Sequence, residues 1–379
     1  MILRKIKLVN FRNYKSLNIN FQKNINIIIG DNAQGKTNIL ESIYTLALTK
    51  SYRTTNDSNL IRLNQEKFII TGETKEDKVF KKLSLELYKG NKVAKINDNV
   101  INKISDYIGN LYVILSSPDD LQMIKGSPSE RRNFLNIEIS QLSSNYIKKY
   151  NEFNKILKMR NDYLKLLYTN SLGDYSYLEI LTNNLIDREV DIYIERNNFI
   201  SKINEYITDI YKNITGIKDL KIVYETNVEF NEFDPIKIKK VLQEKYKKNQ
   251  QREISMGMTL YGPHRDDFTF TIEGNDIKIY GSQGQQKLAF IALKFSEIPI
   301  FEEKTATKPI ILLDDIFSEL DKTKKNRLIQ YIDKDYQVII TSNDTKDISK
   351  KILINANIFK IQDGKIIEKG GNDNGRKER

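Results

Sequence analysis

Residues 30–37 have the types and the spacing of a phosphate-binding loop. They read Gly-Asp-Asn-Ala-Gln-Gly-Lys-Thr, the pattern G-x-x-x-x-G-K-T. In such a loop the backbone N–H groups surround an anion, and the N-terminus of the next helix favours negative charge. We expect Lys36 to reach the β- and γ-phosphates of a nucleotide and Thr37 to hold Mg²⁺. The nucleotide-binding residues predicted here are Gly30, Asp31, Asn32, Ala33, Gln34, Gly35, Lys36, Thr37 and Asn38.

Two aspartates after a second apolar run can complete this site. The run Ile310–Leu313 predicts a buried strand, and Asp314 and Asp315 follow it directly. We expect Asp314 to coordinate Mg²⁺ together with Thr37, and Asp315 to orient or deprotonate the attacking water. An apolar run before two aspartates is common, so it gains weight only beside a phosphate loop. The predicted catalytic residues are therefore Lys36, Asp314 and Asp315.

Arg12 lies close to the phosphate loop in sequence and is predicted to approach the nucleotide, although an exposed turn arginine explains it equally well. The segment Gly281–Lys287 resembles the signature motif of ABC-type ATPases, usually Ser-Gly-Gly-Gln, and Ser318–Asp321 resembles their D-loop. In that superfamily the signature motif meets the nucleotide of a second subunit. The resemblance implies that Ser282 and Gln283 contact ATP in a homodimer that ATP holds together.

The elements that must position these residues are strands and helices in alternation. Residues 25–29 read as a strand buried on both faces, and apolar residues from Ile39 to Ala47 recur at helical spacing. Further strands are predicted at 2–8, 16–21, 67–73, 79–88, 92–97, 111–115, 219–230, 309–314 and 336–341. Hairpins are predicted at 267–280 around Gly274-Asn275 and at 358–368 around Asp363-Gly364. Helices are predicted at 130–167, around 200–214, at 283–300 and at 324–332.

The distance between the two halves of the site predicts an insertion. Lys36 and Asp314 are 278 residues apart, more than a compact P-loop fold needs. Apolar steps of three and four between Ile200 and Ile214 indicate a coiled-coil-like seam, and hence an antiparallel helical arm. The predicted fold is an α/β ABC-type P-loop ATPase head of two lobes with this arm inserted. The predicted boundaries are 1–117 for the first part of the head, 118–218 for the arm, 219–369 for the second part and 370–379 for a disordered tail.

Composition limits the function classes. The 379 residues include no cysteine and one histidine, which excludes disulfides, thiolate metal sites and a cysteine nucleophile. No run of about 18 apolar residues is present, and the first eleven residues are too weakly apolar for a signal peptide, which fits the cytoplasm. The net charge of +11 favours a polyanionic partner, although lysine-rich composition can also reflect an AT-rich genome. Residues 236–250 carry six lysines against one glutamate and are either a solvated helix face or a DNA-backbone patch.

Together these segments resemble the RecF family of bacterial DNA replication and repair proteins from residue 1 to about 369. The most specific matching block is Lys125–Asn136, which no general ATPase motif explains. The other matching segments are Phe11–Tyr14, Gly30–Asn38, Ser51–Thr54, Pro118–Asn136, Gly262–Asp267, Ser282–Lys287 and Leu312–Asp321.

The resemblance implies an ATP- and Mg²⁺-dependent protein that binds duplex, gapped and single-stranded DNA and dimerises on ATP. It implies weak, DNA-dependent ATP hydrolysis that times release. It also implies RecR and RecO as partners in loading recombinase, and a part in DNA replication, recombination, DNA damage repair and the SOS response. The expected location is the cytoplasm, on the nucleoid and not on a membrane.

Three features depart from the patterns of ABC-type ATPases or need a separate interpretation. Many of these ATPases have glutamate where Asp315 stands. Their switch histidine has no match here, and Thr341 or Ser342 is predicted in its place as the γ-phosphate sensor. His264 belongs to a Gly-Pro-His-Arg-Asp segment and is predicted to be structural and hydrogen-bonded.

Three other functions compete with the leading prediction. A structural SMC-like DNA clamp, in which ATP only scaffolds the dimer, is the main alternative, and the short arm argues against it. An ABC transport ATPase ranks far lower, because it would carry Ser-Gly-Gly-Gln and the switch histidine. A metal-dependent nuclease would need an acidic cluster with metal-ligand spacing, which the sequence does not display.

Overall fold

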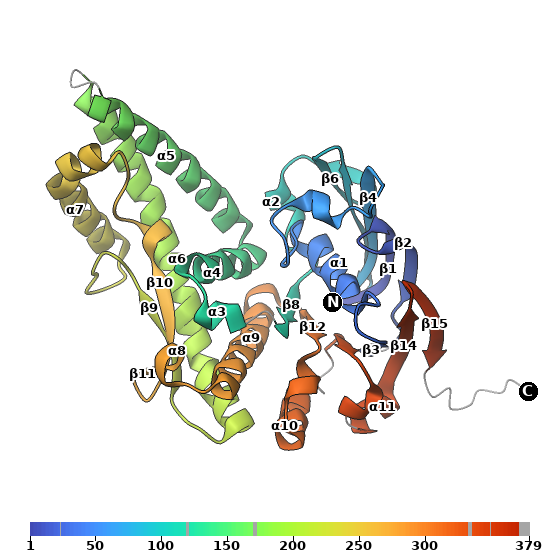
Figure 1. The fold of residues 1–379 in the computed structure, drawn as a ribbon. Coiled ribbons are helices and arrows are strands. Elements are labelled where there is room, and N and C mark those ends of the chain that lie inside the picture. Colours follow the sequence, from blue (N-terminus) through green and yellow to red (C-terminus); the bar gives the residue numbers. More distant parts are fainter. Residues whose placement is uncertain (23, 119–120, 170–172, 333–335, 349, 371–379) are drawn as a thin grey trace, which may run out of the picture. The chain divides into compact units, whose positions relative to one another are not determined.

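The chain forms two units in a computed structural model, which describes residues 1–22, 24–118, 121–169, 173–332, 336–348 and 350–370 (Figure 1). The first unit comprises Met1–Asp120, Asp209–Ile217 and Phe290–Arg379, and the second comprises Leu121–Thr208 and Lys218–Ala289. Two of the boundaries between the units fall within helices, α6 (Tyr175–Thr215) and α9 (Gln283–Thr305). This division places Lys218–Ala289 with the helical segment, whereas the sequence analysis assigns residues after 218 to the ATPase head.

The first unit contains a mixed six-stranded sheet that carries the phosphate loop. Its order is β15-β14-β3-β13-β12-β8, with only the edge strand β15 antiparallel to its neighbour. The bounds are β3 Ile25–Ile29, β8 Val113–Ser116, β12 Ile310–Asp314, β13 Val338–Ser342, β14 Ala356–Gln362 and β15 Lys365–Gly370. The central strands are apolar runs without alternation because both of their faces are buried.

A second, antiparallel sheet of the first unit has the order β2-β1-β4-β5-β6-β7. Its strands are β1 Ile2–Phe11, β2 Tyr14–Asn20, β4 Lys67–Glu76, β5 Val79–Tyr88, β6 Asn91–Ile96 and β7 Asn99–Ile101. The phosphate-loop helix α1, Lys36–Leu48, contacts strands of both sheets. It is therefore buried almost all round after its first turn. This unit also contains α2 Ile104–Tyr107, α10 Lys322–Ile332 and α11 Lys350–Asn355, together with the end of α6 and most of α9.

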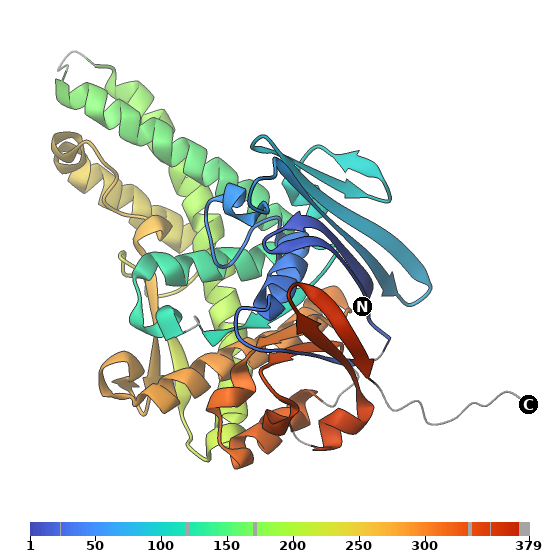
Figure 2. The ribbon, with the colours of Figure 1, turned by 45° about the vertical axis from the view of Figure 1, so that its right-hand side comes forward.

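The second unit is mainly helical. Its helices are α3 Leu121–Lys125, α4 Pro128–Leu142, α5 Ser144–Thr169, the first part of α6, α7 Pro235–Met256 and α8 Ile277–Tyr280. Figures 1 and 2 show α5 and α6 running antiparallel, side by side. Leu164, Leu167, Leu178 and Ile254 form a buried cluster that joins α5, α6 and α7. A small sheet of order β11-β10-β9 completes the unit, with β9 Leu220–Glu225, β10 Asp267–Ile272 and β11 Asn275–Asp276.

Three expectations from the sequence need correction. Residues 277–280 form α8 and not a strand, because the Asp276 side chain accepts the N–H of Lys278 and starts a helical turn. The predicted helix at 130–167 is two helices, α4 and α5, divided at Ser143, whose backbone is extended. Gly370 ends strand β15, so it is not part of a tail, and residues 371–379 lie outside the described residues.

The hairpin predicted at 358–368 is confirmed by β14 and β15, and the antiparallel pairing of α5 with α6 confirms the helical hairpin of the arm. No helix among the described residues is both long enough and apolar enough to cross a membrane.

Candidate functional site

The phosphate loop connects β3 to α1 and fits closely against its neighbours. Gly30 faces the backbone carbonyl of Ile361 in β14, so any side chain there would collide with that strand. Gly35 precedes α1 with φ 104°, a left-handed conformation that favours glycine. A side chain at Gly35 would also meet the Asn13 amide and the Tyr14 hydroxyl. Both glycines of the motif are therefore required by close packing as well as by backbone conformation.

Lys36 is buried at the start of α1, and its ammonium group is held by oxygen atoms of the protein. Its Nζ donates to the carbonyls of Gly30 (2.6 Å) and Asp31 (2.9 Å) and to Oδ1 of Asn343 (3.0 Å). Burial lowers the pKa of Lys36, and the nearby carboxylates of Asp315, Asp314 and Asp31 partly oppose that shift. The ammonium is thus in place beside the loop, where it can exchange these acceptors for phosphate oxygens.

Thr37 and Asp314 meet as the sequence predicts for a magnesium site. The Thr37 hydroxyl donates to Oδ1 of Asp314 at 3.0 Å, and Thr341 Oγ1 donates to the same oxygen at 2.6 Å. Burial raises the pKa of Asp314, and the two hydroxyl donors act in the opposite direction. Hydroxyl and carboxylate oxygens are the donors that Mg²⁺ prefers, so these two side chains fit that ion.

Asp315 leaves the end of β12 in a left-handed backbone conformation, with φ 47°. Its N–H donates to Thr341 Oγ1 at 3.0 Å. The fully buried Thr341 hydroxyl thus bonds to the Asp314 carboxylate and to the backbone N–H of Asp315 at once. A non-glycine residue in this conformation costs about 1 kcal/mol or more and persists where surrounding contacts determine it.

These groups surround one cavity of about 310 Å³ in the first unit. The lining residues are Asn32, Ala33, Gly35, Lys36, Thr37, Asn38, Arg53, Asp314, Asp315 and Asn343. Lys36, Thr37, Asp314 and Asp315 are thereby brought together across 278 residues of sequence. Gly30, Asp31 and Gln34 belong to the loop but do not line the cavity.

Two lining residues, Arg53 and Asn343, were not predicted as site residues. Arg53 follows α1 in the Ser51–Thr54 segment, which the sequence analysis used only to support a family resemblance. Asn343 follows β13 directly, beside Thr341 and Ser342, which were predicted as the γ-phosphate sensor. Instead, the Ser342 hydroxyl donates to the Asp344 carbonyl, and the Asn343 side chain reaches the cavity. The sequence did offer one signal for Asn343, because it is a polar residue at the carboxyl end of a buried parallel strand.

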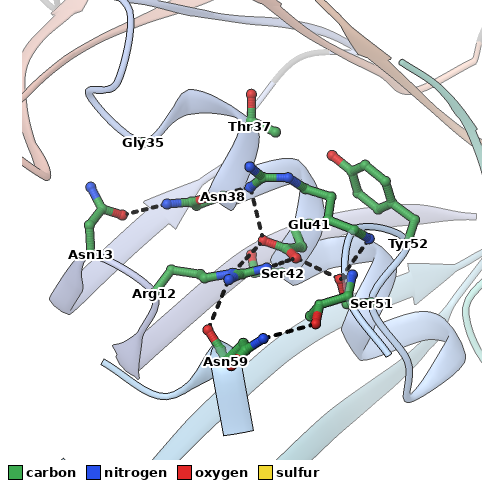
Figure 3. Close-up of polar contacts among 12 residues, drawn as sticks. Arg12, Asn13, Gly35, Thr37, Asn38, Glu41, Ser42, Ser51, Tyr52 and Asn59 are labelled. Atoms are coloured by element: carbon green, nitrogen blue, oxygen red, sulfur yellow. Dashed lines mark hydrogen bonds and ion pairs between the residues drawn. The ribbon is translucent and has the colours of Figure 1, made fainter. Parts of the chain in front are cut away.

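Arg12 does not line this cavity. Its guanidinium forms a paired contact with the Glu41 carboxylate, at 2.8 and 2.5 Å, and donates to the Asn59 carbonyl at 2.9 Å (Figure 3). Its predicted approach to the nucleotide stays a prediction, and the described contacts commit its charge to Glu41.

The signature-like segment lies in the second unit, at the start of α9. The Ser282 N–H donates to Oε1 of Gln285 (2.8 Å), and the Gln285 N–H donates to the Ser282 hydroxyl (3.3 Å). This is a reciprocal helix cap of the Ser-x-x-Gln type. The Gln286 side chain stabilises the turn that precedes α9, because its amide donates to the carbonyls of Ile277 and Gly281. Ser282 and Gln283 are exposed, so their predicted contact with a second subunit is sterically open.

The block Lys125–Asn136 binds the Gly262–Asp267 segment within the second unit. Arg131 pairs with both oxygens of Asp267, at 2.6 and 2.8 Å, and Arg132 donates to the Asp266 carbonyl at 2.7 Å. Pro128 and Glu130 open α4, with Ser127 as its capping residue. The two specific sequence blocks therefore belong to one buried polar contact in this unit.

His264 is mostly buried in that segment, and its Nε2 lies 3.3 Å from the Thr259 carbonyl. Burial lowers the pKa of His264 to about 4, with Arg265 acting in the same direction. A neutral imidazole that donates to a carbonyl agrees with the structural assignment predicted for it.

Comparison with known proteins gives consistent matches over nearly the whole chain. Residues 2–366 match the family model described as the RecF/RecN/SMC N terminal domain. "DNA replication and repair protein RecF" of Ligilactobacillus salivarius (strain UCC118) is 39% identical over 370 residues, covering 97% of this chain and 98% of that protein. The protein of the same name from Bacillus pumilus (strain SAFR-032) is 38% identical, covering 97% and 100%.

Solved structures give the same result. The recombination mediator protein RecF-ATP in the RecFOR pathway superposes with a TM-score of 0.89 at 34% identity, covering 97% of each chain. The RecF-ATPrS structure superposes with a TM-score of 0.88 at 33% identity, covering 97% and 98%. An Smc head bound to the C-winged helix domain of ScpA is similar in fold alone, with a TM-score of 0.53 at 15% identity.

Proposed function

Because this chain belongs to the RecF family and has the family's α/β ABC-type ATPase fold, we propose that it is an ATP-dependent DNA-binding protein of replication and recombinational repair. The observation that carries the proposal is the convergence of Lys36, Thr37 and Asp314 on one cavity, joined by Asp315 and Asn343. A loop that cradles phosphate, a magnesium-binding pair and a carboxylate for water are the parts that ATP hydrolysis requires. RecF relatives are described with ATP, which agrees with this set.

In the proposed hydrolysis of ATP each of these side chains has a distinct role. Asp315 accepts a hydrogen bond from a water molecule and takes its proton as the oxygen attacks the γ-phosphorus. The bond to the β,γ-bridging oxygen breaks, and ADP and phosphate leave. Lys36 stabilises the charge on the phosphate oxygens. Thr37 and Asp314 would hold Mg²⁺, which would supply positive charge to the triphosphate.

Asn343 is the proposed γ-phosphate sensor of this chain. Its Oδ1 accepts from Lys36 at 3.0 Å, which leaves the two N–H donors of the amide for an acceptor in the cavity. An amide can thus bond to Lys36 and to a phosphate oxygen at once, as a histidine with two ring nitrogens can. We therefore assign this role to Asn343, next to the two residues that were predicted for it.

Dimerisation on ATP is the second part of the proposal. Ser282 and Gln283 are exposed at the N-terminus of α9, a long helix whose first N–H groups suit an anion. In the proposed homodimer each copy presents these residues to the triphosphate held by the other. Hydrolysis would then weaken the dimer and time its release from DNA.

Binding of duplex and gapped or single-stranded DNA is the third part. The net charge of +11 favours a polyanion. Of the six lysines on α7, Lys237 and Lys239 pair with acidic residues of the second unit, whereas Lys240, Lys247 and Lys248 are exposed along one face. We assign the DNA-backbone contacts of this helix to those three. We propose partners corresponding to RecO and RecR because a RecF relative is described in the RecFOR pathway. Recombinase loading and a nucleoid-associated cytoplasmic location are proposed together with these partners.

Sizing the protein with and without nucleotide tests the proposal. With ATP and Mg²⁺ on gapped duplex DNA we expect dimers, and with ADP or no nucleotide monomers. Lys36→Ala should lose ATP binding and dimers together, because the phosphate loop loses its cation. Ser282→Arg should keep ATP binding and lose the dimer, because a bulky cation replaces a small cap residue. Sedimentation velocity and a nucleotide-binding titration measure both.

A wild-type protein that stays monomeric with an unhydrolysable ATP analogue, Mg²⁺ and DNA would contradict the dimer mechanism. Dimers without measurable turnover on gapped DNA would instead favour the clamp in which ATP is only a scaffold. Turnover measured on the same samples separates these two readings.

A further inference from the structure

Glu41 is a fully buried carboxylate on α1, three residues beyond Asn38 of the phosphate-loop helix. It accepts hydrogen bonds from three side chains. Arg12 donates from Nε (2.8 Å) and Nη2 (2.5 Å), Ser51 donates from Oγ (2.6 Å), and Arg53 donates from Nη1 (3.4 Å). Figure 3 shows the Arg12 and Ser51 side chains turned toward this carboxylate.

The charges in this cluster do not balance. A buried carboxylate needs a paired cation, because its desolvation costs several kcal/mol. Arg12 supplies that cation in a two-point contact with both oxygens, the strongest geometry available. Arg53 is a second cation beside a carboxylate that is already neutralised. One positive charge therefore remains, and it belongs to Arg53.

The remaining charge is directed into the nucleotide cavity. The Arg53 side chain is 37% exposed and lines the cavity with Lys36 and Thr37. Its Nη1 also donates to Oδ1 of Asn38, at 2.9 Å. By contrast, Arg12 Nη1 is held by the Asn59 carbonyl. Arg12, which the sequence analysis predicted to approach the nucleotide, is therefore bound to other protein groups, whereas Arg53 lines the cavity.

The backbone near Glu41 is also held in a defined conformation. Arg12 has φ 54°, a left-handed conformation that non-glycine residues adopt at a cost of about 1 kcal/mol or more. The Ser51 hydroxyl that donates to Glu41 also accepts the N–H groups of Arg53 (2.9 Å) and Thr54 (3.3 Å). The carboxylate thus fixes both the guanidinium of Arg53 and, through Ser51, the backbone that carries it.

We propose that Glu41 is a positioning residue of the nucleotide site, which holds Arg53 against the cavity so that its guanidinium binds a phosphate oxygen of ATP. Arg12 serves as the counter-ion of this buried side chain. This proposal deepens the proposed function and rests on it, since the ligand is the same triphosphate. Glu41 does not contact the ligand and acts through Arg53.

A double-mutant cycle with an unhydrolysable fluorescent ATP analogue tests the proposal. Glu41→Gln keeps the shape of the side chain and removes its charge, and Arg53→Gln removes the cation in the cavity. Each should weaken binding about tenfold, the size of one charge-assisted hydrogen bond. If Glu41 acts through Arg53, the double variant should bind no more weakly than Arg53→Gln alone. A purely structural carboxylate would instead give losses that multiply.

Glu253→Gln is the matched control. Glu253 is also fully buried and pairs with an arginine, Arg160 at 2.6 Å, but it lies in the second unit. This variant should lower the melting temperature and leave analogue affinity per folded molecule unchanged. If Glu41→Gln does not fold, Ser51→Ala removes the link to the Arg53 backbone and should weaken binding about threefold.

Two results would overturn the proposal: wild-type affinity in a folded Glu41→Gln or Ser51→Ala protein, or multiplied losses in the double variant. Failure of the proposed function looks different, because the wild-type protein would then not bind the analogue and Lys36→Ala would change nothing.

Discussion

At the residue scale, the site is held ready by bonds that a triphosphate must replace. Lys36 donates to two carbonyls of its own loop and to Asn343, so its ammonium stays beside the loop before any phosphate arrives. This arrangement lowers the reorganisation needed on binding, because only acceptors change and the lysine need not travel. Asn343 keeps two donors free of Lys36, which makes it the side chain best placed to report the γ-phosphate.

Asn343→Ala should lower ATP turnover about ten- to a hundredfold while leaving ATP affinity within a few-fold of wild type. The reason is that its donors act on charge that develops on the γ-phosphate during hydrolysis. Steady-state phosphate release and an equilibrium titration with the unhydrolysable analogue measure the two quantities separately. Asn32→Ala, an exposed asparagine of the loop that lines the same cavity, is the control and should change turnover less. Equal losses in both variants would count against the sensor assignment.

At the element scale, turn residues and apolar patterns in the sequence predicted most helices and strands. The order of strands in the sheet then brings the site residues together. The strands predicted at 79–88 and 92–97 are β5 and β6, and they are joined by a two-residue turn at Lys89 and Gly90, which both have positive φ. The helix α8 was not predicted because polar and apolar residues alternate in Ile277–Tyr280, as they do in a strand. The side chain of Asp276 caps this segment and stabilises a helical turn. Four residues are too few for periodicity to distinguish the two.

The candidate site was predictable where a motif fixes spacing and not where the fold alone supplies a residue. Lys36, Thr37 and Asp314 follow from two short motifs. Arg53 and Asn343 have no such spacing, because their place depends on the loop after α1 and on β13 lying between β3 and β12. Arg12 was predicted for proximity in sequence, yet the buried carboxylate of Glu41, which binds its guanidinium, has no sequence signature.

The turn Pro263–Arg265 makes the second unit sensitive to acid through His264. Its pKa is lowered from 6.5 to about 4 by burial, so between these values the unfolded chain binds the proton more readily. This contribution to stability is complete above pH 6.5 and is lost as the pH falls toward 4, by about 3 kcal/mol in all. Urea unfolding of wild type and His264→Gln at pH 7, 5.5 and 4.5 measures it.

The stability difference between the two proteins should shrink as the pH falls. The comparison with His264→Gln is needed because burial raises the pKa of neighbouring Asp266 to about 6, which acts in the opposite direction over the same range. A difference that stays constant with pH would contradict the assignment of a neutral, buried imidazole.

At the scale of the whole molecule, the proposed nucleotide site and the proposed DNA-binding surface differ in how their charges are arranged. The cavity of the first unit is lined by Lys36, Thr37 and Asp314, which suit a triphosphate and its metal. The surplus of positive charge is spread over the chain, and α7 carries three exposed lysines on one face. Such a surface binds phosphates without reading bases, so its contribution should depend on salt and little on sequence.

DNA affinity with ATP present should fall steeply with salt. Three phosphate contacts alone predict a loss of about fortyfold between 50 and 200 mM salt. Changing Lys240, Lys247 and Lys248 together to glutamine should make the slope shallower by nearly three. The matched control, Lys237 and Lys239 to glutamine, removes lysines that are already paired and should change the slope less. Fluorescence anisotropy with gapped duplex DNA gives the slopes, and a flat salt dependence would point to another partner for the charge.

The strand that leads into the phosphate loop pairs with strands that lie more than 300 residues later in the chain. β3 ends at Ile29, yet it is flanked by β13 and β14, which begin at Val338 and Ala356. Contacts so distant in sequence form late, since a long loop must close before they can be made. A nascent chain therefore carries the complete loop sequence for most of its synthesis without a sheet to hold it. We therefore expect the loop to gain its folded conformation, and with it any nucleotide binding, only after β13 and β14 have been made.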